Sequence, residues 1–228
     1  MEGVGILRSI ALVNIANEAI VTQTSEIIWK LLSIYDIVDQ ELAKLFAEKG
    51  GHDAVIEILL SKKKGPGSVP LIKILNGLVK VPQLIKKLLE SGLADSMKLV
   101  NDLYSDDIEI IGLNFDTMKK VSNQKNGRDF LIEKQLVPSL LGNLRKCADH
   151  QNSEDAIMNG FTVLDNLSRN ENGQNTIKDA NAMEILGEIL NIFDNDDDND
   201  DDNDDDVLVE ISEYTDSLSL KLKLSSII

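Results

Sequence analysis

The sequence predicts an all-α fold, a right-handed α-solenoid of about four to five helical repeats. The main observation is a self-similarity at a shift of 46 residues, which maps 126–131 onto 172–177 and Ser122 onto Ser168. A second is composition, because 43% of the residues are hydrophobic and only 4% are aromatic, as in stacked aliphatic helices. Units of this length cannot bury their apolar faces alone, so they stack on their neighbours.

Three kinds of helix recur along the chain. One kind carries an apolar i, i+3/i+4 stripe and follows a turn at Gly51, Gly92, Gln135 or Asn181, so these starts lie 41, 43 and 46 residues apart. A short helix precedes each of these turns. We expect short helices at 81–90, 127–134 and 173–179. The third kind is longer. We expect longer helices at 69–79, 108–121 and 155–167.

The Asn-Gly pairs at 126–127 and 172–173 are expected to supply flexible turns that tolerate positive φ and enter two of the short helices. The periods define a repeat domain over residues 1–193, followed by two further segments. The predicted divisions are 1–50 (irregular), 51–91, 92–134, 135–180, 181–193 (a partial unit), 194–206 (an Asp/Asn low-complexity linker) and 207–228 (a weakly ordered tail).

The tail is predicted to be weakly ordered because Leu218–Leu224 alternate with a period of two, unlike the helices before them. An added edge strand and a partner-binding segment are the alternatives for this stretch. The last apolar stripe stops at Phe193, and no polar capping helix is recognisable beyond it. An uncapped end would expose apolar surface, which predicts self-association.

Residues 161–174 carry the most specific motif. Leu164-Asp165-Asn166-Leu167 and the turn Asn170-Glu171-Asn172-Gly173-Gln174 resemble the helix ending and following turn of the armadillo repeat, and residues 11–16 match the same helix ending. The resemblance covers about 1–193 unevenly, since the phase slips between Asn17 and Gly50. HEAT repeats, with two helices per unit, remain a close alternative.

This resemblance implies a binding surface. In armadillo proteins the long third helix of each unit lines a concave face, and some of these proteins use an asparagine at the Leu-x-Asn-Leu position to hold the backbone of an extended peptide. Asn14 and Asn166 occupy that position here, whereas Gly77 and Lys120 stand at the corresponding places. Thr162 replaces the tryptophan of nuclear import adaptors, which argues against a receptor of that kind. Asn166 is either a groove contact or a surface asparagine that ends a helix.

The charge distribution suggests the chemistry of the partner. The net charge is −16, yet residues 61–148 hold fifteen Lys and Arg against nine Asp and Glu. Stacking of the third helices could align four lysines into a basic strip that attracts an acidic peptide or protein surface. The alternative is an ordinary solvated helical face. The predicted partner-binding residues are Lys73, Lys80, Lys119, Lys120, Asn166 and Arg169.

Nucleic acid is disfavoured as a partner, because the chain is acidic overall and offers no aromatic platform for stacking bases. The Asp/Asn tract at 194–206 contains ten Asp and is expected to stay extended and solvated. When the tract is aligned with a calcium-binding loop, Asn199 and Asp205 fall at the positions where that loop needs Gly and Glu, so the match is poor. Two alternative roles are a response to cations and a fold-back of the tract onto the lysine strip.

No enzyme signature is present in the sequence. His52 and His150 lack metal-ligand spacing, and the glycines of 62–68 do not match a phosphate-binding loop. We therefore expect no catalytic residue, no metal and no cofactor. The predicted function is a non-enzymatic protein-interaction scaffold or adaptor, and the alternative is a regulatory subunit that modulates a partner enzyme or a nucleotide-exchange assembly.

Cys147 is the only cysteine, so no internal disulfide can form, which fits a reducing compartment. There is no signal-peptide pattern, and no apolar run approaches the ~20 residues that span a bilayer. We expect a cytoplasmic protein, with nuclear, cytoskeletal or ciliary association as variants. The resemblance does not choose among transport, adhesion, signalling and cytoskeletal roles.

Overall fold

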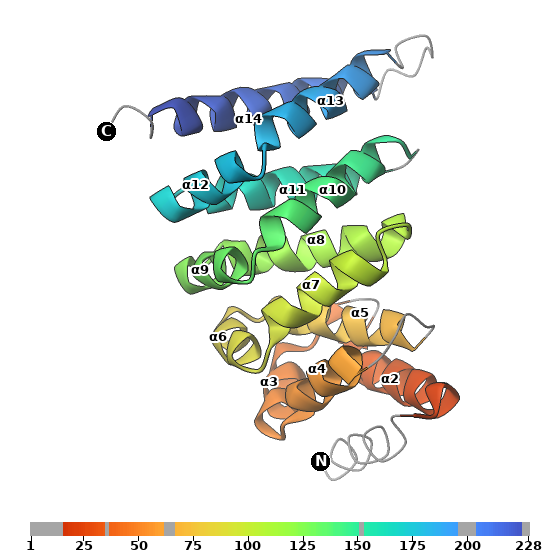
Figure 1. Ribbon diagram of the computed structural model, residues 1–228. Helices are drawn as coiled ribbons and strands as arrows, with labels where there is room; N and C mark the ends of the chain where they lie inside the picture. Colours follow the sequence, from red (N-terminus) through yellow and green to blue (C-terminus); the bar gives the residue numbers. More distant parts are fainter. Residues whose placement is uncertain (1–15, 35–36, 62–66, 151–152, 196–203, 225–228) are drawn as a thin grey trace. The chain divides into compact units, whose positions relative to one another are not determined.

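The computed structural model describes residues 16–34, 37–61, 67–150, 153–195 and 204–224 (Figure 1). Apart from one short hairpin, the regular elements in these ranges are α-helices, and they follow one another as repeats of three. The chain divides into two compact units, 1–104 and 105–228, and each is described by itself. The predicted all-α repeat fold is confirmed.

The first unit contains six helices among its described residues. They are α2 (Glu18–Leu32), α3 (Gln40–Glu48), α4 (Gly51–Ser61), α5 (Ser68–Val79), α6 (Pro82–Glu90) and α7 (Leu93–Leu103). The long third helices α2 and α5 pack on each other, while α4 contacts α3, α5 and α7. The contact faces are the apolar stripes of the sequence, and Leu71, Ile74 and Leu78 of α5 are almost completely buried.

A short hairpin accounts for the phase slip between residues 17 and 50. Strand β1 (Ser33–Ile34) pairs antiparallel with β2 (Ile37–Val38), with Ser33 opposite Val38, between the third helix α2 and the first helix α3. The segment is therefore regular helix on both sides of the two paired strands. Asp39 then caps α3, its side chain accepting a hydrogen bond from Leu42 N–H at 2.9 Å.

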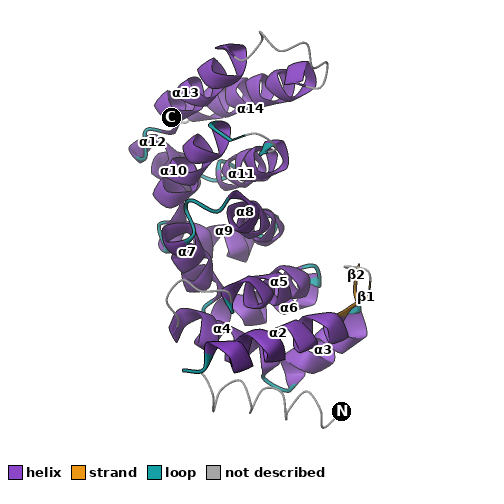
Figure 2. Ribbon diagram, turned by 90° about the vertical axis from the view of Figure 1, so that its right-hand side faces the viewer, coloured by secondary structure: helices purple, strands orange, loops and turns teal. Residues whose placement is uncertain are grey.

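The second unit continues the same order of helices. They are α8 (Ile108–Ser122), α9 (Lys125–Glu133), α10 (Leu136–Ala148), α11 (Glu154–Leu167), α12 (Glu171–Asp179), α13 (Ala182–Asn195) and α14 (Asp204–Leu224). Figure 2 shows α10 and α13 on one side of this unit and α8, α11 and α14 on the other. Helices α8 and α11 approach closely, since a Cβ on Gly112 would lie 3.3 Å from the Ala156 Cβ.

Helix α14 stands where the sequence predicted a weakly ordered tail. Its buried residues Ile211, Thr215, Leu218 and Leu222 follow helical spacing, and they face α11 and α13 as the third helix of a last repeat. The alternating leucines suggested a strand with one apolar face. In the helix they do not share a face, because Leu218 and Leu222 are buried whereas Leu220 is 60% exposed. A capping helix is therefore present. Its exposed residues include Ser212, Glu213, Asp216, Ser217 and Lys223.

The positive-φ turns do not lie at the Asn-Gly pairs, contrary to the prediction. They lie between the first and second helices of each repeat, at Gly50, Gly92, Gln135 and Asn181. The Asn-Gly pairs 126–127 and 172–173 are instead inside the first turns of α9 and α12. The glycines are needed there for space, because added Cβ atoms would lie 2.0 Å and 1.9 Å from the carbonyl oxygens of the preceding third helices.

Cys147 of α10 is fully buried, and burial raises the pKa of its thiol from 9.0 to about 11. Between these values the unfolded chain loses a proton that the folded chain keeps, so this thiol lowers the free energy of unfolding as pH rises from about 9 to about 11. The expected slope is up to about 1.4 kcal/mol per pH unit. Denaturant titrations of the native chain and of Cys147→Ala across this range test the prediction, which fails if both show the same pH dependence.

Candidate functional site

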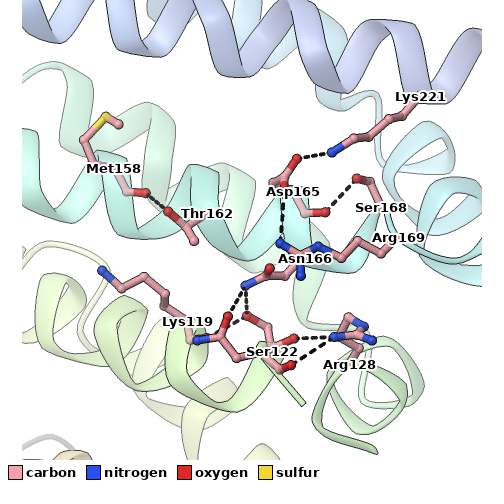
Figure 3. A network of polar contacts seen from close by, with 11 residues as sticks. Lys119, Ser122, Arg128, Met158, Thr162, Asp165, Asn166, Ser168, Arg169 and Lys221 are labelled. Carbon is pink, nitrogen blue, oxygen red and sulfur yellow. Dashed lines mark hydrogen bonds and ion pairs between the residues drawn. The ribbon is translucent and has the colours of Figure 1, made fainter. Parts of the chain in front are cut away.

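The predicted site residue Asn166 lies near the end of α11 and is only 1% exposed. Its Nδ2 donates a hydrogen bond to Ser122 Oγ at 2.9 Å and another to Asn123 Oδ1 at 3.2 Å, both at the end of α8 (Figure 3). Asn166 thus joins two consecutive third helices. The sequence offered a groove contact or a surface asparagine, and the structure places it as a buried bridge between repeats.

The partners of Asn166 are held in place by the corner between α8 and α9. Ser122 Oγ donates to the Lys119 carbonyl at 2.9 Å, and Arg128 Nη1 donates to the carbonyls of Ser122 and Asn123 at 3.0 and 3.3 Å. The corner between α11 and α12 repeats this device, with Gln174 Nε2 donating to the Ser168 carbonyl at 2.8 Å. These side chains satisfy carbonyls that a helix end leaves without partners.

The amide oxygen of Asn166 differs from its amide nitrogen in its hydrogen bonding. Oδ1 is buried and has no hydrogen-bond partner among the described residues. A buried polar atom without a partner costs about 1–3 kcal/mol, and such atoms are uncommon in folded proteins.

Charged side chains surround this amide on the third helices, and acids accompany the bases. Lys120 pairs with Asp116 one turn earlier on α8, and Lys119 donates to Asn159 Oδ1 of α11. Just beyond the end of α11, Arg169 Nη2 lies 3.5 Å from Oδ2 of Asp165 on that helix. The other carboxylate oxygen of Asp165 accepts from Lys221 Nζ of α14 (Figure 3). We call this set, with Asn166, the third-helix face of the second unit.

The remaining predicted residues belong to the first unit. Lys73 is half-buried on α5, and Lys80 is exposed at the C-cap of that helix. A single basic strip that joins them to Lys119 and Lys120 stays a prediction. At Gly77, which takes the place of the armadillo asparagine, an added Cβ would lie 2.8 Å from the Trp29 ring. The indole therefore packs where an asparagine side chain would begin.

The predicted site residues did not include four further members of this face, Asp116, Asn159, Asp165 and Lys221. Two of them carried a readable signal, because Asp116 precedes Lys120, and Asp165 precedes Arg169, by the four residues that place side chains together on a helix. Lys221 had no such signal. It reaches Asp165 from 56 positions away, through a helix that the sequence did not predict.

Other candidate chemistry finds little support in the part of the chain that the structure describes. Within it, no three His, Cys, Asp or Glu side chains come together as a metal site. Most of the Asp tract, residues 196–203, lies outside the described residues, and so does the proposed fold-back of that tract. None of the described helices combines the length and the apolar character needed to cross a membrane.

Neither a protein-family model nor a curated protein matches this sequence. Solved structures match in fold. A designed armadillo repeat protein, YIII(Dq.V1)4CPAF in complex with the peptide (KR)4, has a TM-score of 0.65 at 16% identity and covers 90% of this chain and 82% of its own. A second, YIII(Dq)4CqI, has a TM-score of 0.57 at 15% identity, covering 91% and 92%.

An engineered protein, Northeast Structural Genomics Consortium target OR329, has a TM-score of 0.58 at 11% identity and covers 99% of this chain and 98% of its own. Identities this low show the fold alone. The fold is an armadillo-like helical repeat, as the residues around Asn166 predicted. The three helices per unit agree with armadillo rather than HEAT repeats.

Proposed function

We propose that this chain is a non-enzymatic interaction scaffold that binds an extended segment of a partner protein on its third-helix faces. The observation that carries the proposal is the Asn166 Oδ1 atom, a buried acceptor without a donor among the described residues. A backbone N–H of a bound segment is the donor that would satisfy it. The peptide in the structure of the designed armadillo repeat protein supports this kind of ligand.

An acidic segment is the partner that we propose. On the third-helix face of the second unit the cations Lys119, Lys120, Arg169 and Lys221 outnumber the carboxylates Asp116 and Asp165. Carboxylates of the bound segment would replace Asp116 and Asp165 as partners of these cations. Lys73 and Lys80 are the predicted cations of the first unit. The reducing environment expected for the single cysteine favours a cytoplasmic partner.

Arg169 is the residue that links charge recognition to the amide. Its side chain reaches back to Asp165, the residue directly before Asn166 on α11 (Figure 3). In the proposed complex, an acidic side chain of the partner draws the guanidinium away from Asp165. The partner's backbone can then approach Asn166 Oδ1. The 3.5 Å separation of Arg169 and Asp165, together with the 53% exposure of the arginine side chain, makes this exchange inexpensive.

Peptide titrations test the proposal. Acidic, uncharged polar and basic peptides of equal length are titrated into the full chain at low and high salt, by calorimetry or fluorescence anisotropy. We expect the acidic peptide to bind most tightly, with an affinity that falls as salt rises. Arg169→Glu should weaken it, whereas Lys178→Glu on α12 should change it little. Tighter binding of the basic peptide would overturn the charge preference, and equal weak binding of all three would overturn the proposed function.

The role of Asn166 is tested with a matched pair of variants. Asn166→Ala removes the orphan acceptor and should weaken peptide binding by about tenfold, the usual worth of one hydrogen bond. Ser122→Ala removes one partner of Asn166 Nδ2 but leaves Oδ1 in place. It should reduce stability in a similar way without reducing affinity. If both variants lose affinity equally, Asn166 acts only through the packing of α11 on α8.

A further inference from the structure

Four Asn-Gly pairs occur in the chain, at 76–77, 126–127, 159–160 and 172–173. This dipeptide can rearrange without any enzyme. The glycine nitrogen loses its proton and attacks the side-chain carbonyl carbon of the asparagine, and the side-chain nitrogen takes up a proton and leaves as ammonia. Water then opens the resulting succinimide to aspartate or isoaspartate. The reaction needs a glycine N–H that can leave its hydrogen bond and a backbone that can bend.

The four glycine N–H groups differ in how firmly the fold keeps them in a hydrogen bond. Gly77 and Gly160 lie inside α5 and α11, where the helix ladder engages the N–H group. Gly127 and Gly173 are third residues of α9 and α12, in the first turn, which has no intrahelical acceptors. Both first-turn pairs occupy the same place in their repeats, so they form a natural comparison.

The two first-turn pairs differ in their caps. Gly173 N–H donates to Oδ1 of the N-cap residue Asn170 at 2.8 Å. The N-cap residue of α9 is Gln124, and it makes no side-chain capping bond to that turn. Asparagine is a favoured N-cap, and such a bond contributes about 1 kcal/mol to the helix start. The first turn of α9 therefore opens more readily than that of α12.

We infer that Asn126 deamidates fastest of the four Asn-Gly asparagines in the folded chain, and that Asn172 is protected by the Asn170 cap. The position matters because Gly127 packs against the end of α8, where an added atom would lie 2.0 Å from the Val121 carbonyl oxygen. An isoaspartate at 126 lengthens the backbone by one carbon directly before this contact. The corner it disturbs also carries Ser122 and Asn123, the two partners of Asn166.

The test is an ageing experiment on the full chain. The folded protein is incubated in mildly alkaline buffer and sampled over time, and a protease specific for lysine then releases peptides 74–80, 126–134 and 147–178, which contain the four asparagines. Fragment mass spectrometry locates aspartate and isoaspartate at each asparagine. We expect Asn126 to react first, Asn172 about fivefold more slowly, and Asn76 and Asn159 more slowly still. In denaturant the four pairs should react at similar rates, since only the fold distinguishes them.

Two variants exchange the caps and give the decisive comparison. Asn170→Ala should bring the rate at Asn172 up to that at Asn126, and Gln124→Ser, which introduces a favoured cap, should slow Asn126. Circular dichroism verifies that both variants remain folded during the incubation. Equal rates at Asn126 and Asn172 in the folded native chain would overturn the inference. It would also fail if Asn170→Ala left the rate at Asn172 unchanged.

Discussion

Replacing Gly173 with alanine is expected to destabilise the second unit by about 3 kcal/mol or more. A Cβ at this position would lie 1.9 Å from the Leu167 carbonyl oxygen and 2.7 Å from its carbon. These are backbone atoms at the end of α11, so the clash cannot be relieved by turning a side chain. Gly127→Ala should behave alike, because its Cβ would meet the Val121 carbonyl oxygen at 2.0 Å.

Gly142 and Gly187 provide the matched controls. Both lie inside helices of the second unit, α10 and α13, and an added Cβ at either would meet nothing within 4 Å. Alanine there should raise the free energy of unfolding by roughly 0.5–1 kcal/mol through better helix propensity. Denaturant unfolding monitored by circular dichroism measures all four variants. If Gly173→Ala and Gly142→Ala had equal effects, the close approach of α12 to α11 would be refuted.

Replacing Leu218 with aspartate is the second change expected to have a large effect, a loss of about 3 kcal/mol. Leu218 is 2% exposed on the face of α14 that packs on α11 and α13. A carboxylate there would be buried without a partner, so α14 should detach and its amides should exchange faster with solvent. Detachment uncovers the apolar flank of α11, and the variant should therefore self-associate.

Leu220→Asp is the control, since it makes the same chemical change two residues along the same helix. Leu220 is 60% exposed, so the stability should change by no more than about 0.5 kcal/mol. The pair also decides between the helix and the alternating strand that the sequence suggested for this segment. In a strand of period two, Leu218 and Leu220 would share a face, and both substitutions would act alike.

The helical repeats could be predicted because their signals are local. The apolar stripes and the turns near Gly51, Gly92, Gln135 and Asn181 each reflect a single helix or its beginning, and the repeat of 46 residues made them visible. The hairpin at Ser33–Val38 and helix α14 were missed. Two residue pairs are too short to show a strand pattern, and the alternating leucines of α14 concealed a helical stripe.

The candidate site was predicted less completely than the fold. Asn166 and Arg169 were identified through their motif, and Lys119 and Lys120 through the charge of the central region. The sequence did not identify their acidic and amide partners, which are Asp116, Asn159 and Asp165. A count of charges along the chain cannot show which carboxylates lie beside which cations, so the sequence did not reveal that this basic face also carries two carboxylates.

The sequence by itself determined that this chain forms armadillo-like repeats, because hydrophobic periodicity and turn residues act within one unit and do not depend on distant partners. Tertiary structure alone decided that Asn166 bridges α11 to α8, that Gly127 and Gly173 must lack a side chain, and that Lys221 reaches Asp165. These contacts join residues from 6 to 56 positions apart, and their distances arise only when the helices stack.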